Sequence, residues 1–138
     1  NYSNFFFYNQ KVYNGPAFNR YRSGEKREQG MLKNGFKSGM WTGWNKKGEK
    51  QYSGEYGRGK AHGKWTGYHP NGDKKYEGLY EQGFQSGKWA YYDKKGRKNL
   101  EETYYFCTEK CRDEHPPDRR GVAYICEKLG KITDTKKL

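Results

Sequence analysis

Three cysteines and one histidine near the C-terminal end are the residues whose types and spacing could do chemistry. Cys107, Cys111, His115 and Cys126 form the pattern C-x3-C-x3-H-x10-C. Thiolates and imidazoles can hold zinc, and structural sites usually place about two to four residues between the first two ligands, as here. The wide gap between His115 and Cys126 is atypical of such sites. We therefore expect no metal, and these four residues are the set that would bind one.

The cysteines could instead form a disulfide or remain reduced and packed inside the tail. A disulfide from Cys126 to Cys107 or Cys111 would leave one thiol over and would need an oxidising compartment. A cysteine nucleophile is disfavoured, because the nearby His115 is followed at once by two prolines. Acid–base chemistry needs carboxylates or a histidine that converge in a cleft, yet the acidic residues are scattered over turns and the tail. We expect no enzymatic activity, no cofactor and no small-molecule substrate.

The element that organises the chain is a 24-residue unit written three times between Gly35 and Tyr104. The copies begin G-F-K-S-G-M-W-T-G-W, G-K-A-H-G-K-W-T-G-Y and G-F-Q-S-G-K-W-A-Y-Y. A fixed period of this length marks a repeat architecture, in which stacked units supply the core. The expected organisation is an N-terminal cap strand with a degenerate repeat over 1–34, three repeats over 35–104 and a cysteine-containing capping tail over 105–138.

Each unit is predicted to be a β-hairpin. In the middle copy Asn71-Gly72 separates two aromatic-rich runs, and these residue types favour a type I′ turn. A turn centred there gives three cross-strand pairs: Tyr68 with Lys75, Gly67 with Tyr76, and Trp65 with Gly78. The first copy gives Gly43 with Tyr52 and Trp41 with Gly54, so that rings lie over glycines. In the third copy the pairs become Tyr91 with Leu100 and Trp89 with Glu102, as expected of a terminal unit.

The alternation of side chains along a strand sorts the rings onto two faces. One face is predicted to be the core: Trp41, Tyr52, Tyr56, Trp65, Tyr76, Tyr80, Trp89 and Tyr104. The other carries Trp44, Tyr68 and Tyr92, which face Gln51, Lys75 and Asn99. This second face is either a solvated surface or a trough that binds a partner. We take Trp44, Tyr68, Tyr92, Gln51 and Lys75 as the candidate partner-binding residues.

The formal net charge of +12 favours an acidic partner, whether a protein, an anionic membrane or nucleic acid. Lysine pairs near the predicted turns would place a basic edge along one side of the stack: Lys46, Lys47, Lys74, Lys94 and Lys95. This edge is either simply solvated or able to bind carboxylates and phosphates. We expect a protein partner, with anionic lipid as the alternative and nucleic acid disfavoured.

Both ends of the chain are expected to cap the stack. Residues 11–34 align with a drifted repeat, in which Gly24 and Gly30 correspond to Gly48 and Gly54. The uncharged run Tyr2–Tyr8 is expected to pair with the first hairpin. A stripe of apolar residues at helical spacing predicts a helix over 119–129: Val122, Ile125, Cys126 and Leu129. This helix is expected to cover the last hairpin, and the alternative is that it binds a partner.

The pattern G-x-x-x-G-x-W-x-x-Y, followed by N-G-x-x-x-x-E-G-x-Y, resembles the MORN repeat in its bacterial variant form. The segments Tyr52–Tyr56 and Tyr76–Tyr80 match the Y-x-G-x-aromatic opening of that repeat. The resemblance covers about half of the chain and implies an all-β fold: an elongated, twisted antiparallel sheet of stacked hairpins without catalytic chemistry. It implies use as a protein-interaction scaffold or, as an alternative, an antitoxin that neutralises a toxin, or peripheral binding to anionic lipid.

No run approaches the length of a transmembrane span. The chain begins at Asn1 rather than methionine, which would fit the removal of a signal peptide. We expect a bacterial envelope or secreted location, with the cytoplasm as the alternative.

Overall fold

The structure is a computed structural model that describes residues 7–8, 11–105 and 131–137. The described residues are all-β and contain no helix. Their strands are β1 (Phe7–Tyr8), β2 (Lys11–Val12), β3 (Gly15–Arg20), β4 (Lys26–Lys33), β5 (Phe36–Trp44), β6 (Lys50–Gly57), β7 (Lys60–Tyr68), β8 (Lys74–Glu81), β9 (Phe84–Tyr92), β10 (Lys98–Tyr105) and β11 (Lys131–Lys137).

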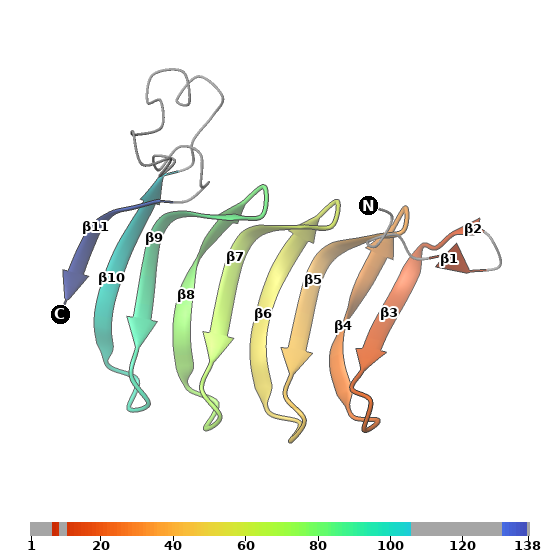
Figure 1. The fold of residues 1–138 in the computed structure, drawn as a ribbon, viewed down its shortest axis with the longest axis horizontal. Coiled ribbons are helices and arrows are strands. Elements are labelled where there is room, and N and C mark those ends of the chain that lie inside the picture. Colours follow the sequence, from red (N-terminus) through yellow and green to blue (C-terminus); the bar gives the residue numbers. More distant parts are fainter. Residues whose placement is uncertain (1–6, 9–10, 106–130, 138) are drawn as a thin grey trace, which may run out of the picture.

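Strands β3 to β11 form one antiparallel sheet in which every strand pairs with its neighbours in sequence. The sheet is elongated and twisted, and β3 and β11 lie at opposite ends without closing on each other (Figure 1). Such a sheet of consecutive hairpins is the predicted fold. It has two long edges formed by turns, and these edges differ in their turn chemistry.

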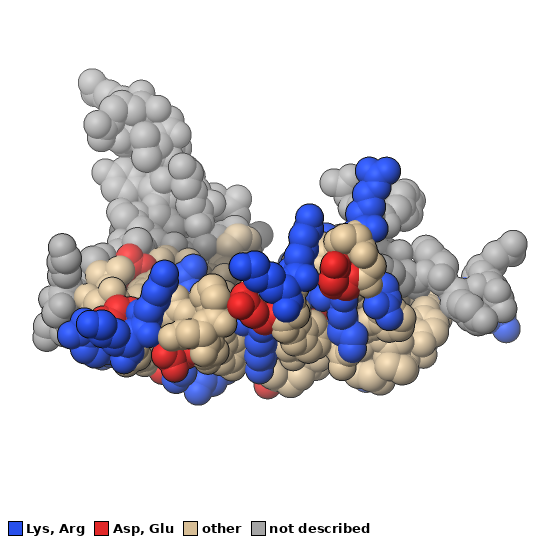
Figure 2. Space-filling view, turned by 90° about the horizontal axis from the view of Figure 1, so that it is seen from below, with Lys and Arg blue, Asp and Glu red and all other residues tan. Residues whose placement is uncertain are grey.

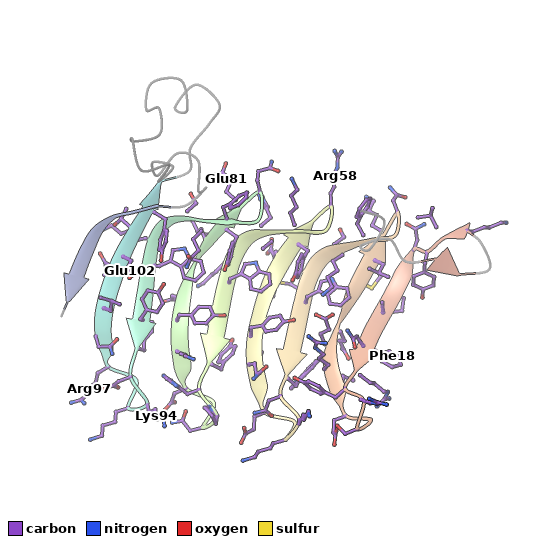
Figure 3. The ribbon with its side chains drawn as sticks, viewed as in Figure 1. Phe18, Arg58, Glu81, Lys94, Arg97 and Glu102 are labelled. Carbon is purple, nitrogen blue, oxygen red and sulfur yellow. The ribbon has the colours of Figure 1, made fainter. Side chains whose placement is uncertain are left out.

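Two-residue turns form one edge, at Asn34-Gly35, Arg58-Gly59 and Gln82-Gly83, where Figure 3 labels Arg58 and Glu81. Both residues of each turn have positive φ, 52° and 73° in the first, 50° and 79° in the second, and 53° and 90° in the third. Type I′ turns require this geometry because their twist matches that of the strands. The last of these turns also bonds to strand β7, which follows the preceding turn: the N–H of Gly83 donates to the carbonyl of Ala61, at 2.8 Å.

The opposite edge, named here the tip edge, consists of the turns at 21–25, 45–49, 69–73 and 93–97. The predicted type I′ turn at Asn71-Gly72 is wrong, because Gly72 has positive φ (89°) and Asn71 does not. The N–H of Gly72 donates to the carbonyl of His69 at 2.9 Å, and His69 N–H donates to Asp73 O at 2.8 Å. This is the pattern of a tight turn followed by a left-handed glycine, and it adds a bulge to the second strand.

The bulge corrects the predicted pairs nearest the turn. Tyr68 pairs with Lys74 rather than Lys75. In the neighbouring hairpins Trp44 pairs with Lys50 and Tyr92 with Lys98, rather than with Gln51 and Asn99. Beyond the bulge the predicted register is confirmed in all three copies: Gly67 with Tyr76, Trp65 with Gly78, Gly43 with Tyr52, Trp41 with Gly54, Tyr91 with Leu100 and Trp89 with Glu102.

The core lies on one face of this single sheet, named here the ring face, and it carries the eight aromatic residues predicted for it. Trp65, Trp89 and Tyr104 form its buried cluster, against which the neighbouring tyrosines pack. Trp65 and Tyr80 meet edge to face, with their ring centroids 5.4 Å apart. Aromatic rings therefore provide the apolar contact that aliphatic residues provide in most cores.

Rings cover glycines, but not always the glycines expected. The tyrosine rings lie as predicted, since Tyr52 covers Gly43. Gly54, however, is covered by Trp65 of the following strand rather than by Trp41. The same shift places Trp41 over Gly30 and Trp89 over Gly78. Each tryptophan thus joins its own hairpin to the preceding one.

A register shift beside each covered glycine explains why tryptophan is used there. Between Gly54 and Glu55 the pairing with β7 skips two residues, Gly63 and Lys64. The indole N–H of Trp65 donates to the carbonyl of Glu55 at 2.9 Å. Trp41 and Trp89 make the equivalent bonds to Met31 and Leu79, both at 3.0 Å. A phenylalanine ring could not donate this bond to the carbonyl beside the bulge, because it carries no N–H or O–H group.

The ends of the chain agree with the predictions only in part. Strands β3 and β4 form the drifted repeat, with Ala17 opposite Gly30 as Trp41 is opposite Gly54. The described part of the N-terminal aromatic run, Phe7–Tyr8, pairs with β2 and not with the first hairpin. Strand β11 extends the sheet beyond β10 and was not anticipated. The helix predicted over 119–129 lies outside the described residues.

Candidate functional site

The sequence-predicted row of Trp44, Tyr68 and Tyr92 lies on the face opposite the ring face, where β5, β7 and β9 reach the tip edge. All three rings are half-buried. A lysine ammonium lies over each ring: Lys26 Nζ is 5.5 Å from the Trp44 centroid, Lys50 Nζ 4.6 Å from Tyr68 and Lys74 Nζ 5.4 Å from Tyr92. We name this side the lysine face, defined by these six residues.

The three pairs of ring and lysine repeat regularly across the sheet. Successive pairs are two strands apart, so that they are spaced by about 10 Å. Each cation–π contact is worth about 0.5–1 kcal/mol at an exposed site. The face therefore presents a row of amphipathic sites, each made of an apolar ring and a positive charge. We call each pair of ring and lysine, together with the side chains that contact it, a station.

The candidate residues Gln51 and Lys75 do not oppose this row. Both are exposed, and the bulge gives their expected places to Lys50 and Lys74. Sequence reasoning missed Lys26 and Lys50 as the partners of the rings. Their 24-residue recurrence with Lys74 and Lys98 was the available signal.

An acidic residue completes the last full station of the lysine face. Glu77 accepts hydrogen bonds from Lys74 Nζ at 2.8 Å and from the Tyr92 hydroxyl at 2.7 Å, and Lys64 Nζ lies at 3.5 Å. These contacts, led by the Lys74 ammonium, lower the pKa of Glu77 to about 2. One repeat further on, Glu101 pairs with Lys98 and lies 3.6 Å from Lys88. The face thus contains carboxylate sites that the chain fills itself.

The predicted basic edge is placed along the tip edge. Figure 2 shows lysine and arginine side chains there, with acidic side chains between them. Lys46, Lys47, Lys94 and Lys95 are exposed at two of the tips. Lys74 differs, because it is half-buried and engaged by Glu77 and Tyr92. The tip edge is therefore mixed in charge, with exposed cations at its tips.

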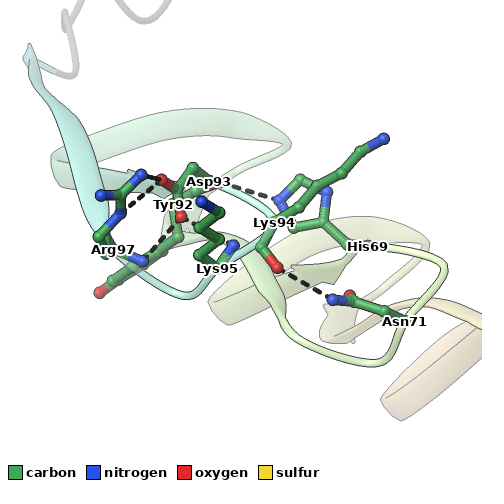
Figure 4. Close-up of polar contacts among 7 residues, drawn as sticks. All are labelled: His69, Asn71, Tyr92, Asp93, Lys94, Lys95 and Arg97. Carbon is green, nitrogen blue, oxygen red and sulfur yellow. Dashed lines mark hydrogen bonds and ion pairs between the residues drawn. The ribbon is translucent and has the colours of Figure 1, made fainter.

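Side chains hold the tips in fixed positions relative to one another. Figure 4 shows the contact between two successive tips, where Asn71 Nδ2 donates to the carbonyl of Lys94 at 3.0 Å. His69 Nε2 lies 2.9 Å from the carbonyl oxygen of Tyr92. Within the last tip the Asp93 carboxylate accepts the N–H groups of Lys95 and Arg97, at 2.8 and 2.9 Å. The lysines at this tip are thus displayed on an ordered turn (Figures 3 and 4).

An ion pair on the ring face was missed by sequence reasoning. Lys37 Nζ lies 2.6 Å from Glu28 Oε2, and the Tyr52 hydroxyl donates to the same oxygen at 2.9 Å. The lysine also lies over the rings of Trp41 and Tyr56, at 4.3 and 5.1 Å. Burial opposes ionisation of Glu28, but the bonds from Lys37 and Tyr52 outweigh it and lower the pKa of this carboxyl. Glu28 occupies the position that corresponds to Tyr52 one repeat earlier, so a carboxylate replaces the aromatic ring at this end of the ring face.

The cysteine and histidine set of Cys107, Cys111, His115 and Cys126 lies outside the described residues. Within the described part of the chain, no group of three or more potential ligands is placed to hold a metal ion. That part also contains no helix long and apolar enough to cross a membrane.

Comparison of the chain with protein-family models, with curated proteins and with solved structures gives no match.

Proposed function

We propose that this chain is a non-catalytic repeat scaffold, of the MORN-like kind, which binds an acidic protein partner through the lysine face and the adjoining tip edge. The observation that carries the proposal is the row of three half-buried rings, each beneath a lysine ammonium, at one repeat's spacing. A regular row of this kind suits an extended partner segment rather than a small molecule.

The chemistry of the face supports a protein partner. Interfaces are enriched in aromatic residues, methionine and arginine, with rings as frequent hot spots. Further along the strands of the sheet, toward the edge opposite the tip edge, Met31 and Met40 are 49% and 54% exposed, and Leu79 is 51% exposed. The rings and these side chains offer apolar contact, while the lysines select acidic residues. Anionic lipid offers charge alone as a common feature, without a reason for the apolar row.

Charge supports an acidic partner. The chain carries 28 lysines and arginines against 16 acidic residues. On the lysine face the acidic residues Glu77 and Glu101 are each already engaged by two lysines. The remaining positive charge raises the rate of encounter with an acidic surface. Neutralisation of a toxin is the special case in which the acidic partner is the toxin.

Two charge-matched variants of the full chain test whether location or net charge governs binding. The first, Lys46→Ala with Lys47→Ala, removes two exposed cations from the tip edge. The second, Arg58→Ala with Lys60→Ala, removes two exposed cations from the opposite edge. Affinity for the purified partner is measured for both and for Tyr68→Ala, and circular dichroism verifies that each variant is folded.

The proposal expects the tip-edge variant and folded Tyr68→Ala to bind several-fold more weakly, and the opposite-edge variant to bind as the parent does. Equal weakening by both double variants would mean that net charge alone drives binding, and the proposal would fail. Loss of the fold in Tyr68→Ala would show that this ring belongs to the core.

A further inference from the structure

Two positions of the lysine face lack the carboxylate that the later repeats contain: Gln29 beside Lys26, and Ser53 beside Lys50. Glu77 and Glu101 stand at equivalent positions of successive repeats, and one repeat earlier the same position is Ser53. The Ser53 side chain is uncharged and shorter than that of glutamate. Its hydroxyl lies 3.4 Å from the hydroxyl of Tyr68.

The cation of this station has no acid of its own. Lys50 corresponds to Lys74, and its Nζ lies over the ring of Tyr68 at 4.6 Å. Lys74 and Lys98 each pair with a glutamate three residues later, whereas Lys50 makes no ion pair within the described residues. In the preceding repeat Lys26 Nζ donates to Gln29 Oε1 at 2.7 Å. Gln29, Glu77 and Glu101 thus each accept a hydrogen bond from the lysine three residues before them, whereas Ser53 does not pair with Lys50.

The Glu77 station shows what the Ser53 station would bind. There the Glu77 carboxylate of β8 lies between the ammonium of Lys74, three residues earlier, and the hydroxyl of Tyr92 on the following strand, at 2.8 and 2.7 Å. Lys50 and Tyr68 occupy the same two positions around Ser53. Charge-assisted hydrogen bonds of this kind are the strong ones in proteins.

The neighbourhood of the Ser53 station is apolar where the later station is basic. Lys64 assists Glu77 from 3.5 Å, and its counterpart one repeat earlier is Met40. Met40 and Met31 lie on adjacent strands and are about half exposed, at 54% and 49%. A ligand here would meet one cation, two hydroxyls and the apolar side chain of Met40, with the exposed Glu55 opposite Met40 on β6.

We propose that an acidic side chain of the protein partner binds between Lys50 Nζ, Tyr68 Oη and Ser53 Oγ, as Glu77 binds one repeat further on. An adjoining apolar side chain of the partner then lies on Met40 and Met31. This inference rests on the proposed function and narrows it: the partner segment is acidic and apolar, and it docks over β5, β6 and β7.

The test uses the full chain and a peptide of alternating glutamate and leucine, with a glutamine and leucine peptide as the uncharged control. Ser53→Glu should fill the station from within, because Glu77 and Glu101 already do this in the same sheet. Its affinity for the glutamate peptide, measured by titration calorimetry, should fall about tenfold or more, the size of one charge-assisted hydrogen bond. Ser53→Ala should bind within about threefold of the parent, because the hydroxyl alone contributes little.

A second variant, Glu77→Ser, should open another station and raise the stoichiometry for the glutamate peptide from one to two. Thermal melting of each variant verifies the fold, and Lys50→Gln repeats the test without a new charge. Parent-like binding by folded Ser53→Glu and Lys50→Gln would overturn the inference. The inference would also be overturned if the parent chain bound phosphatidylserine vesicles but not the glutamate peptide, and Ser53→Glu abolished the vesicle binding.

The failure of this inference can be told from failure of the proposed function. If Tyr68→Ala no longer binds the purified partner while Ser53→Glu still does, the lysine face binds the partner, but no acidic side chain of the partner binds beside Ser53. If both retain it, the proposed function fails as well.

Discussion

Trp65 of β7 covers Gly54 of β6 so closely that a methyl group on Gly54 would lie 2.1 Å from the indole ring. The same relationship joins Trp41 to Gly30 and Trp89 to Gly78, at 2.4 and 2.3 Å. Because the two members of each pair belong to successive hairpins, these contacts join the repeats to one another. Successive hairpins are thus joined both by the backbone pairing of their neighbouring strands and by these ring contacts.

Gly54→Ala should lower the free energy of unfolding by about 1–3 kcal/mol, because the indole must move to admit the methyl group. Gly57→Ala is the matched control in the same strand, since its methyl group would meet His62 at an ordinary 3.7 Å. Urea unfolding followed by tryptophan fluorescence measures both. Equal stability of the two variants would contradict the packing described here.

Trp65→Phe should cost about 1–3 kcal/mol, because the carbonyl of Glu55 loses its indole donor beside the bulge. Trp44→Phe provides the comparison, since Trp44 makes no indole hydrogen bond to any residue that the structure describes. It should change stability by less than about 1 kcal/mol. If the two substitutions cost the same, the bond to Glu55 contributes nothing to stability.

Arg58→Asn should stabilise the fold by about 0.5–1 kcal/mol. Arg58 has a φ of 50°, and asparagine tolerates this conformation better than a long side chain does. Asn34 already occupies the same position of the first two-residue turn. Arg22→Asn, in the exposed turn 21–25, is the control and should be neutral. A lower melting temperature for Arg58→Asn would refute the assignment of this turn.

Glu77 should make stability depend on pH in the acid range. Its pKa is about 2 in the folded chain, below the ordinary value of 4.5, so folding favours the ionised form. The contribution is complete above about pH 4.5 and is lost as the pH falls toward 2. The stability advantage of the parent chain over Glu77→Gln should therefore shrink between pH 5 and 2.

The control for this experiment is Glu81→Gln, on the edge of two-residue turns, where Glu81 is exposed. Melting temperatures across the pH series measure both variants. An advantage over Glu77→Gln that grows on acidification would mean that the pKa is raised in the folded state.

The 24-residue period determined most of the fold in advance. Because rings and glycines recur in phase, pairs such as Gly67 with Tyr76 could be placed before the structure was known. The turn at Asn71-Gly72 could not, since Asn-Gly suits two kinds of turn and the choice depends on the residues around it. The true type I′ turns contain Asn34, Arg58 and Gln82, and two of these are weak turn signals.

The site was predicted less completely than the fold. The row of Trp44, Tyr68 and Tyr92 follows from alternation alone, but the bulge exchanged Lys75 for Lys74 as the residue paired with Tyr68. The bonds from the tryptophans to neighbouring hairpins depend on a second register shift that leaves no mark in the sequence beyond a glycine. Pairing of Glu28 with Lys37 joins β4 to β5 through side chains whose types the repeat does not maintain.

The central claim, that the lysine face holds one specific acidic partner, is tested most directly by capture from the native source. The parent chain and folded Tyr68→Ala serve as baits side by side, at low salt and at about 0.5 M salt, which screens surface charge. We predict one dominant acidic protein, retained by the parent chain at both salts and reduced with the variant. A broad mixture of anionic molecules that binds both baits equally and elutes at high salt would contradict the account.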